Sequence, residues 1–206
     1  MTGVRIRSLA AAVGVAALLA SACGTRFESP AAVVDGHRIA QEAVQRDDDI
    51  FLLFPSTAQQ FAGQAGHKNL TRLVLFRLIL LEVLRPYATG HGVSANAATV
   101  AQQVQQLTSD FGSAPALQAR LRTLGLTLTD VRGNVADTTI ITSVETTVVA
   151  QRLGSAAATA SQQQKDQVFV AFLQQQLRAA RIEVNPRFGK LDITMTTVSP
   201  IVSTQG

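Results

Sequence analysis

The sequence contains few of the side chains that usually stabilise small secreted domains or carry chemistry. Its 206 residues include no Trp, one Tyr and one Cys, and only 16% of them are charged. A single thiol excludes a disulfide within the chain. An aromatic content of 5%, without interleaved basic residues, argues against a nucleic-acid partner. The rest is rich in Ala, Val, Leu, Thr and Gln, a composition that favours helices over a β-sandwich.

The only cysteine, Cys23, follows a segment with the layout of a secretory signal peptide. Arg5 and Arg7 form a short basic start, residues 10–20 are apolar, and Ser21-Ala22 places small residues directly before the thiol. This order of charged, apolar and small residues is typical of a signal peptide that is removed from the mature protein.

The segment Leu19-Ala20-Ser21-Ala22-Cys23 resembles the bacterial lipoprotein signal. The resemblance implies cleavage before Cys23, a diacylglycerol on its sulfur and an acylated amino end. The protein would then be anchored by lipid to the extracytoplasmic face of the cell membrane, with the bilayer as a partner. An ordinary signal peptide with an incidental cysteine, or an uncleaved N-terminal anchor, are the alternatives.

This interpretation divides the chain into four parts. Residues 1–22 are the signal peptide, 23–31 a tether, 32–192 one folded domain and 193–206 an irregular tail. Loss of Arg5 and Arg7 lowers the formal charge from +4 to +2, which is no footprint for nucleic acid. The remaining chain of roughly 180 residues is long enough for one sizeable core or two small ones.

Short strands are predicted at both ends of the domain. Ala32-Val33-Val34 is apolar, Asp35-Gly36 is a strong signal for a hairpin turn, and His37-Arg38-Ile39 returns from it. Near the other end, Ile182-Glu183-Val184 alternates like a strand and stops at Asn185-Pro186.

Between these strands the pattern is helical. We expect a helix over residues 40–54 that Pro55 stops, then a loop or weak turn over 59–68. Asn69 is a credible N-cap for a helix over 70–85 that ends at Pro86. That helix is apolar nearly all round, which indicates a central core position.

The sequence of the second half of the domain predicts four more helices. They cover residues 94–111, 115–124, 127–153 and 162–180, and Thr127 with Asp130 has the pattern of a capping box. Because residues 138–149 are rich in Thr and Val, a strand is an alternative there. Residues 154–160 form a linker of small side chains.

No catalytic or metal-binding constellation is evident. His37, His67 and His91 are far apart in the sequence and have no helical metal-site spacing. The run Asp47-Asp48-Asp49 could attract a cation, but consecutive helical residues point in different directions, which favours a solvated face. Gly63-Gln-Ala-Gly66 lacks the Lys-Ser/Thr of a phosphate loop. We therefore expect no cofactor, metal or catalytic residue.

The order of elements resembles the N-terminal chaperone domain of the SurA and PrsA family. The resemblance rests on the Ala32 to Ile39 hairpin leading into a helix, on His91-Gly92-Val93-Ser94 and Phe111-Gly112-Ser113 before helices, and on the closing Ile182 to Pro186 segment. It implies a mainly α fold, a SurA N-terminal-like helical domain, in which a small β element pairs the N-terminal hairpin with the C-terminal strand.

The chain also departs from that family. SurA and PrsA insert a parvulin-type prolyl isomerase before the closing helix, whereas residues 154–160 are far too few for a folded module. We therefore expect a protein that is not an enzyme.

The resemblance implies a membrane-anchored chaperone-like lipoprotein that binds unfolded or extended polypeptides through an apolar groove. The alternatives are a prolyl isomerase-related enzyme and an envelope scaffold or partner-binding lipoprotein. Five phenylalanines are candidates to line the groove, with plain core packing as the alternative for each of them: Phe51, Phe54, Phe76, Phe169 and Phe172.

Overall fold

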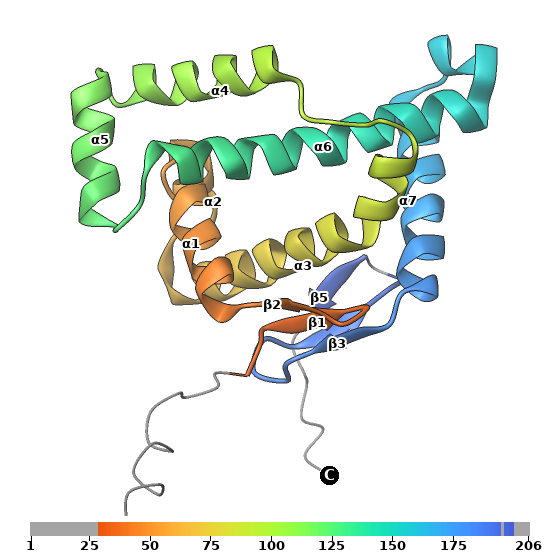
Figure 1. Cartoon of the computed structure of the whole chain (residues 1–206), viewed down its shortest axis with the longest axis horizontal. Coiled ribbons are helices and arrows are strands. Elements are labelled where there is room, and N and C mark those ends of the chain that lie inside the picture. Colours follow the sequence, from red (N-terminus) through yellow and green to blue (C-terminus); the bar gives the residue numbers. More distant parts are fainter. Residues whose placement is uncertain (1–28, 195, 200–206) are drawn as a thin grey trace, which may run out of the picture.

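The computed structural model of the chain describes residues 29–194 and 196–199, so Cys23 and the predicted signal peptide lie outside the described residues. The described chain is mainly helical with a small antiparallel sheet of order β2-β1-β3, as predicted. Strand β1 (Ala32–Val34) pairs with both β2 (His37–Ile39) and β3 (Ile182–Val184). The two ends of the domain therefore meet, red-orange beside blue in Figure 1.

The hairpin forms where the sequence predicts it, because its turn suits the residues present. Asp35 and Gly36 have φ values of 49° and 88°, the left-handed geometry of a two-residue hairpin turn. The Asp35 side chain also accepts a hydrogen bond of 2.8 Å from the Arg181 backbone N–H. This bond holds the turn against the corner that leads into β3.

Seven α-helices and one 3₁₀ turn join these strands within the described residues. Their bounds are α1 Gln41–Phe51, α2 Pro55–Gln60, α3 Gly63–Gly90, α4 Ala97–Asp110, α5 Ala114–Thr123, α6 Leu128–Leu153, η1 Gly154–Ala158 and α7 Gln162–Ala179. The segment 138–149 is helical, not a strand. Its Thr hydroxyls bond to carbonyls one turn earlier in α6, such as Thr139 to Val135 at 2.9 Å, so the helix satisfies them internally.

Helix α3 is longer at both ends than the sequence indicates. Its N-terminus begins at Gly63 in the predicted loop, where Gly66 packs so close to the backbone of Phe61 that a Cβ would come within 2.6 Å of it. Asn69 is inside the helix and not at its cap. At the other end Pro86 does not terminate the helix, because buried Ala88 and the packed ring of Tyr87 hold the last turn in place. Tertiary packing here outweighs the loss of one backbone hydrogen bond.

The segment after Asp192, predicted to be irregular, contains a strand. β4 (Lys190–Asp192) and β5 (Thr197–Ser199) form a second, two-stranded antiparallel sheet. The alternation that marks a strand is too short in three residues to be recognised without its partner. Residues 200–206 lie outside the described residues.

Buried side chains form two separate cores. The main core joins β1, α3, the C-terminal half of α6 and α7, with Leu70, Leu75 and Ile79 fully buried in α3. The second core joins the end of α1 to α4, α5 and the N-terminal half of α6, through Ile50, Leu107, Leu121 and Val131 among others. Helix α6 runs through both, and α4 lies along it in Figure 1.

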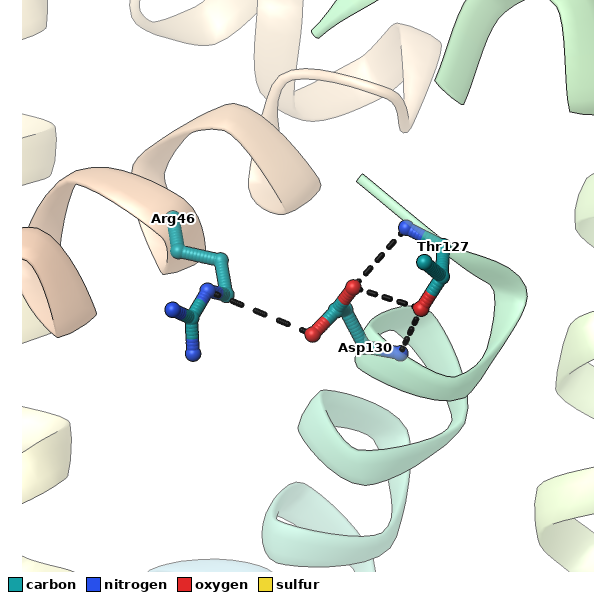
Figure 2. Close-up of polar contacts among 3 residues, drawn as sticks. All are labelled: Arg46, Thr127 and Asp130. Carbon is teal, nitrogen blue, oxygen red and sulfur yellow. Dashed lines mark hydrogen bonds and ion pairs between the residues drawn. The ribbon is translucent and has the colours of Figure 1, made fainter. Parts of the chain in front are cut away.

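Capping contacts fix the start of α6 against α1. The Thr127 N–H donates a 2.8 Å bond to the Asp130 carboxylate, and the Asp130 N–H donates to the Thr127 hydroxyl at 3.2 Å. Arg46 of α1 lies 4.0 Å from the same carboxylate (Figure 2). The predicted capping box is confirmed, and it also links two helices of the second core.

Candidate functional site

A central cavity of about 430 Å³ opens between the β2–α1 corner, α3 and α6. Helix α3 supplies one face of it at helical spacing, with Leu78, Leu81 and Glu82 followed by Arg85 one turn later. Much of the wall is apolar. The remaining lining residues are Arg38, Ile39, Ala40, Ala43, Ala88, Thr89, Val93, Asp137 and Ile140.

Some charged side chains of the central cavity have a partner of opposite charge within the described residues, and Asp137 does not. Arg85 donates two hydrogen bonds to Glu82, at 2.7 and 3.2 Å, so these two charges neutralise each other, and Glu82 raises the pKa of Arg85. Asp137 of α6 receives no hydrogen bond and no ion pair from the described residues. Burial raises the pKa of Asp137, while Arg77 acts in the opposite direction. Asp137 is therefore the least satisfied charged group of the wall.

A second hollow, the α4–α6 groove, has a volume of about 750 Å³ and is more open to solvent than the central cavity. Small and aliphatic side chains form most of it, including Val100 and Ala101 of α4 and Gly133 and Ala136 of α6. Its polar members are Gln105, Thr108, Thr129 and Arg132. A groove of this kind offers an apolar surface to a binding partner, without an array of buried hydrogen-bonding groups.

A polar seam separates the two cores. It consists of Asp47 and Asp48 of α1, Arg77 of α3, and Asn134 and Thr138 of α6. On α1, Asp47 and Asp48 lie in sequence between Val44 of the main core and Ile50 of the second core. On α6, Thr138 lies between Val135 of the second core and Ile140, which packs against the main core, whereas Asn134 lies within the second-core segment.

An ion pair forms the centre of the seam. Arg77 donates a 2.6 Å hydrogen bond to Asp47, and both side chains are almost fully buried. Thr71 donates to Asp48 at 2.6 Å, but burial dominates and raises the pKa of Asp48 to about 6. One oxygen of Asp48, Nε of Arg77 and the side-chain N of Asn134 have no hydrogen-bond partner among the described residues.

The seam corrects the prediction of a solvated acidic face. Asp48 is 4% exposed, and Asp47 pairs with an arginine 30 positions away in the sequence. Sequence reasoning missed this because nothing local shows that α1 packs its acidic side onto α3. Nor do the described residues contain a group of three or more His, Cys, Asp or Glu side chains placed to hold a metal ion.

The five candidate phenylalanines are not gathered along a groove. Phe76, Phe169 and Phe172 are buried in the main core, and Phe51 packs against that core with Arg77 over its ring. Phe54 packs against the second core. None of the five lines the central cavity or the α4–α6 groove. Core packing, the alternative considered for each, is the arrangement in the structure.

The residues that line the two hollows were not singled out by the sequence. Leu78, Leu81 and Glu82 share one helical face, which is a usable signal, but the opposing wall comes from Asp137 and Ile140, more than 50 positions later. The histidines are dispersed, and His91 stacks on Tyr87 with ring centres 3.9 Å apart. No helix of the part described is long and apolar enough to cross a membrane.

Comparison with protein-family models, with curated proteins and with solved structures finds no match to this chain.

Proposed function

We propose that the protein is a membrane-anchored, extracytoplasmic, chaperone-like lipoprotein that binds unfolded or extended polypeptides in the α4–α6 groove and catalyses no reaction. The observation that carries the proposal is the chemistry of that groove. It is open, lined largely by Val, Ala and Gly, and poor in polar groups that would select one sequence. Such a surface binds apolar segments of many chains, because its contacts are hydrophobic and non-directional.

The surrounding surface supports binding in a groove and not on a flat patch. Among the described residues, Leu73 and Val170 are the most exposed large apolar residues, at 45% and 37%, and they lie on different helices. Isolated exposed apolar residues are normal on a folded protein. The apolar area offered to a partner is thus concentrated in hollows, where an extended segment would be enclosed from two sides.

The anchoring part of the proposal rests on the lipoprotein-like segment at Cys23. A lipid-anchored domain would work beside the membrane, where secreted chains emerge unfolded. The non-catalytic part rests on the SurA and PrsA resemblance and on the short connection between α6 and α7, in which Gly154–Ala158 forms a single 3₁₀ turn. A parvulin-type module has no room there.

The first test measures aggregation of an unfolded secreted protein in the presence of residues 24–206. We expect suppression by the unaltered domain and a clear loss with Ala101→Glu, which places a charge in the groove from an exposed helical position. Gln102→Glu is the matched control, because it adds the same charge to the same helix outside the groove lining. Equal activity of the two variants, or no suppression at several-fold excess, would refute the proposal.

Three further measurements separate the alternatives. Cys23→Ser should move the protein from the membrane fraction to the soluble fraction and abolish incorporation of labelled fatty acid. A proline-limited refolding assay should show no acceleration, and acceleration would favour the isomerase-related alternative. Crosslinking in membranes should capture many polypeptides, whereas one dominant partner would favour the envelope scaffold.

A further inference from the structure

The central cavity has the composition of a ligand site of a different kind from the groove. Its volume of about 430 Å³ is within the usual range for small-molecule sites, about 300–1,000 Å³. Leu78, Leu81 and Ile140 supply hydrocarbon from two helices, and Asp137 stands on α6 one turn before Ile140. The cavity thus combines an apolar wall with two carboxylates, of which Glu82 is bonded to Arg85.

Whether the cavity favours a cation or an anion depends on which of its charged side chains already have a partner of opposite charge. Arg85 and Glu82 bind each other through two hydrogen bonds. Arg38 stands on β2 with its side chain exposed to water. Asp137 is partly buried, and both cations that act on it are engaged elsewhere. Arg77 donates a 2.6 Å bond to Asp47, and Arg85 is bonded to Glu82. An unmet negative charge therefore remains in the wall.

We propose that the central cavity binds an organic cation, an ammonium or guanidinium group on a short hydrocarbon chain, with Asp137 as its counter-ion. The hydrocarbon lies against Leu78, Leu81 and Ile140. A cation placed here gains a charge-assisted hydrogen bond to a carboxylate that lacks one, in surroundings where water screens the attraction incompletely. The same chemistry occurs in a free alkylamine and in the side chain of a lysine or arginine of a polypeptide.

A cation fits the cavity better than an anion does. An anion would have to rely on Arg38, which is hydrated, or separate Arg85 from Glu82. It would also bring a further negative charge close to Asp137 and Glu82, which line the same cavity from opposite sides. Bringing like charges together in a partly buried site is unfavourable. This inference does not depend on polypeptide binding in the α4–α6 groove, because the two hollows have no lining residue in common.

The test compares n-butylammonium, n-butanol and n-butyrate as probes of the full-length chain at pH 7.5, by nuclear magnetic resonance titration of methyl groups. We expect shifts of the Leu78, Leu81 and Ile140 methyls to saturate with butylammonium at the lowest concentration. Butanol should bind about tenfold or more weakly, because it has the chain without the charge. Butyrate binding as tightly as butylammonium would overturn the proposal, and this comparison needs no variant.

Asp137→Asn then removes the charge with little change of shape. It should weaken butylammonium binding about tenfold or more and leave butanol binding unchanged. Asp110→Asn is the matched control, since it removes an exposed carboxylate at the end of α4, away from the cavity lining. Unchanged butylammonium affinity in Asp137→Asn would refute the assignment of the counter-ion.

A peptide arm identifies the source of the cation. A short apolar peptide with a central lysine is compared with the same peptide carrying norleucine, which keeps the chain and lacks the charge. Competition with butylammonium by the lysine peptide alone assigns the cavity to a basic side chain of a polypeptide. Failure of both peptides to compete, with butylammonium still bound, assigns it to free amines.

Discussion

The two cores differ in where their parts lie along the chain. The main core is closed by β1 and β3, which are about 150 positions apart, and it buries most of one side of the 28-residue helix α3. The second core is largely local, since α4, α5 and the start of α6 follow one another. Its only buried apolar members from earlier in the chain are Ile50 of α1 and Leu53 of the turn after α1.

They differ as much in how deeply their helices are buried. Helix α4 buries Val104 and Leu107, and α5 buries Leu117 and Leu121, whereas α3 buries ten residues. The comparison indicates that the helix pair α4 and α5 opens at a lower free energy than the rest. One wall of the α4–α6 groove is therefore helix α4, which belongs to this less stable part. A polypeptide segment bound in the groove would contact a helix that opens more easily than the rest of the fold.

The polar seam is the place where the two cores meet, and breaking it has the largest expected effect. Arg77→Met leaves Asp47 buried and unpaired, which should lower the free energy of unfolding by about 3–5 kcal/mol. The double variant Arg77→Met, Asp47→Leu should recover most of that loss. Urea unfolding measures both, and a double variant as unstable as the single one would contradict the role assigned to the ion pair.

Equivalent truncations in the two cores should destabilise different parts of the chain. Ile79→Ala in the main core and Leu121→Ala in the second core each delete a fully buried side chain, at about 2–5 kcal/mol. We expect Ile79→Ala to speed amide hydrogen exchange throughout the described chain. Leu121→Ala should speed it in α4 and α5 and leave α3 protected. Uniform acceleration in both variants would show that the cores unfold as one unit.

Asp48→Asn is expected to stabilise the protein, in a way that depends on pH. Because burial raises the pKa of Asp48 from 3.8 to about 6, the folded state binds this proton more tightly than the unfolded state. The contribution of Asp48 to stability is full below pH 3.8 and is lost as pH rises through about 6. The gain from Asn should reach roughly 2–3 kcal/mol above pH 7 and vanish near pH 4. Thermal unfolding across that pH range measures it.

Asp130 affects stability with the opposite pH dependence to Asp48, and its substitution has the smallest expected effect. Its bonds from Thr127 lower its pKa, so its contribution is present at neutral pH and is lost as the pH falls through that lowered value. Asp130→Ala removes one half of the capping box and should cost about 1 kcal/mol. The loss should appear as faster amide exchange at the start of α6 and in α4. Loss of protection in α3 instead would contradict the separation of the two cores.

Local signals predicted much of the fold. The Asp35-Gly36 turn, the Thr127 and Asp130 capping box and the helix over residues 162–180 each carry their own geometry, and all three are present. The prediction that the helix ends at Pro86 was wrong because it too used only local information. It considered the missing N–H of Pro86 and not the packing of Tyr87 and Ala88. The candidate phenylalanines were chosen as large apolar residues, a property that a core and a groove share.

What the sequence by itself determined is the N-terminal hairpin and most of the helices, because turn geometry, capping and hydrophobic period act over a few residues. It also predicts the lipoprotein-like segment ending at Cys23, which lies outside the described residues. Only the tertiary structure decided the central cavity and the polar seam, since each joins α3 to side chains of α1 and α6 that are tens of positions distant. Whether Asp48 is solvated or Asp137 lacks a partner depends on which helices pack against them, and burial alone makes those charges costly.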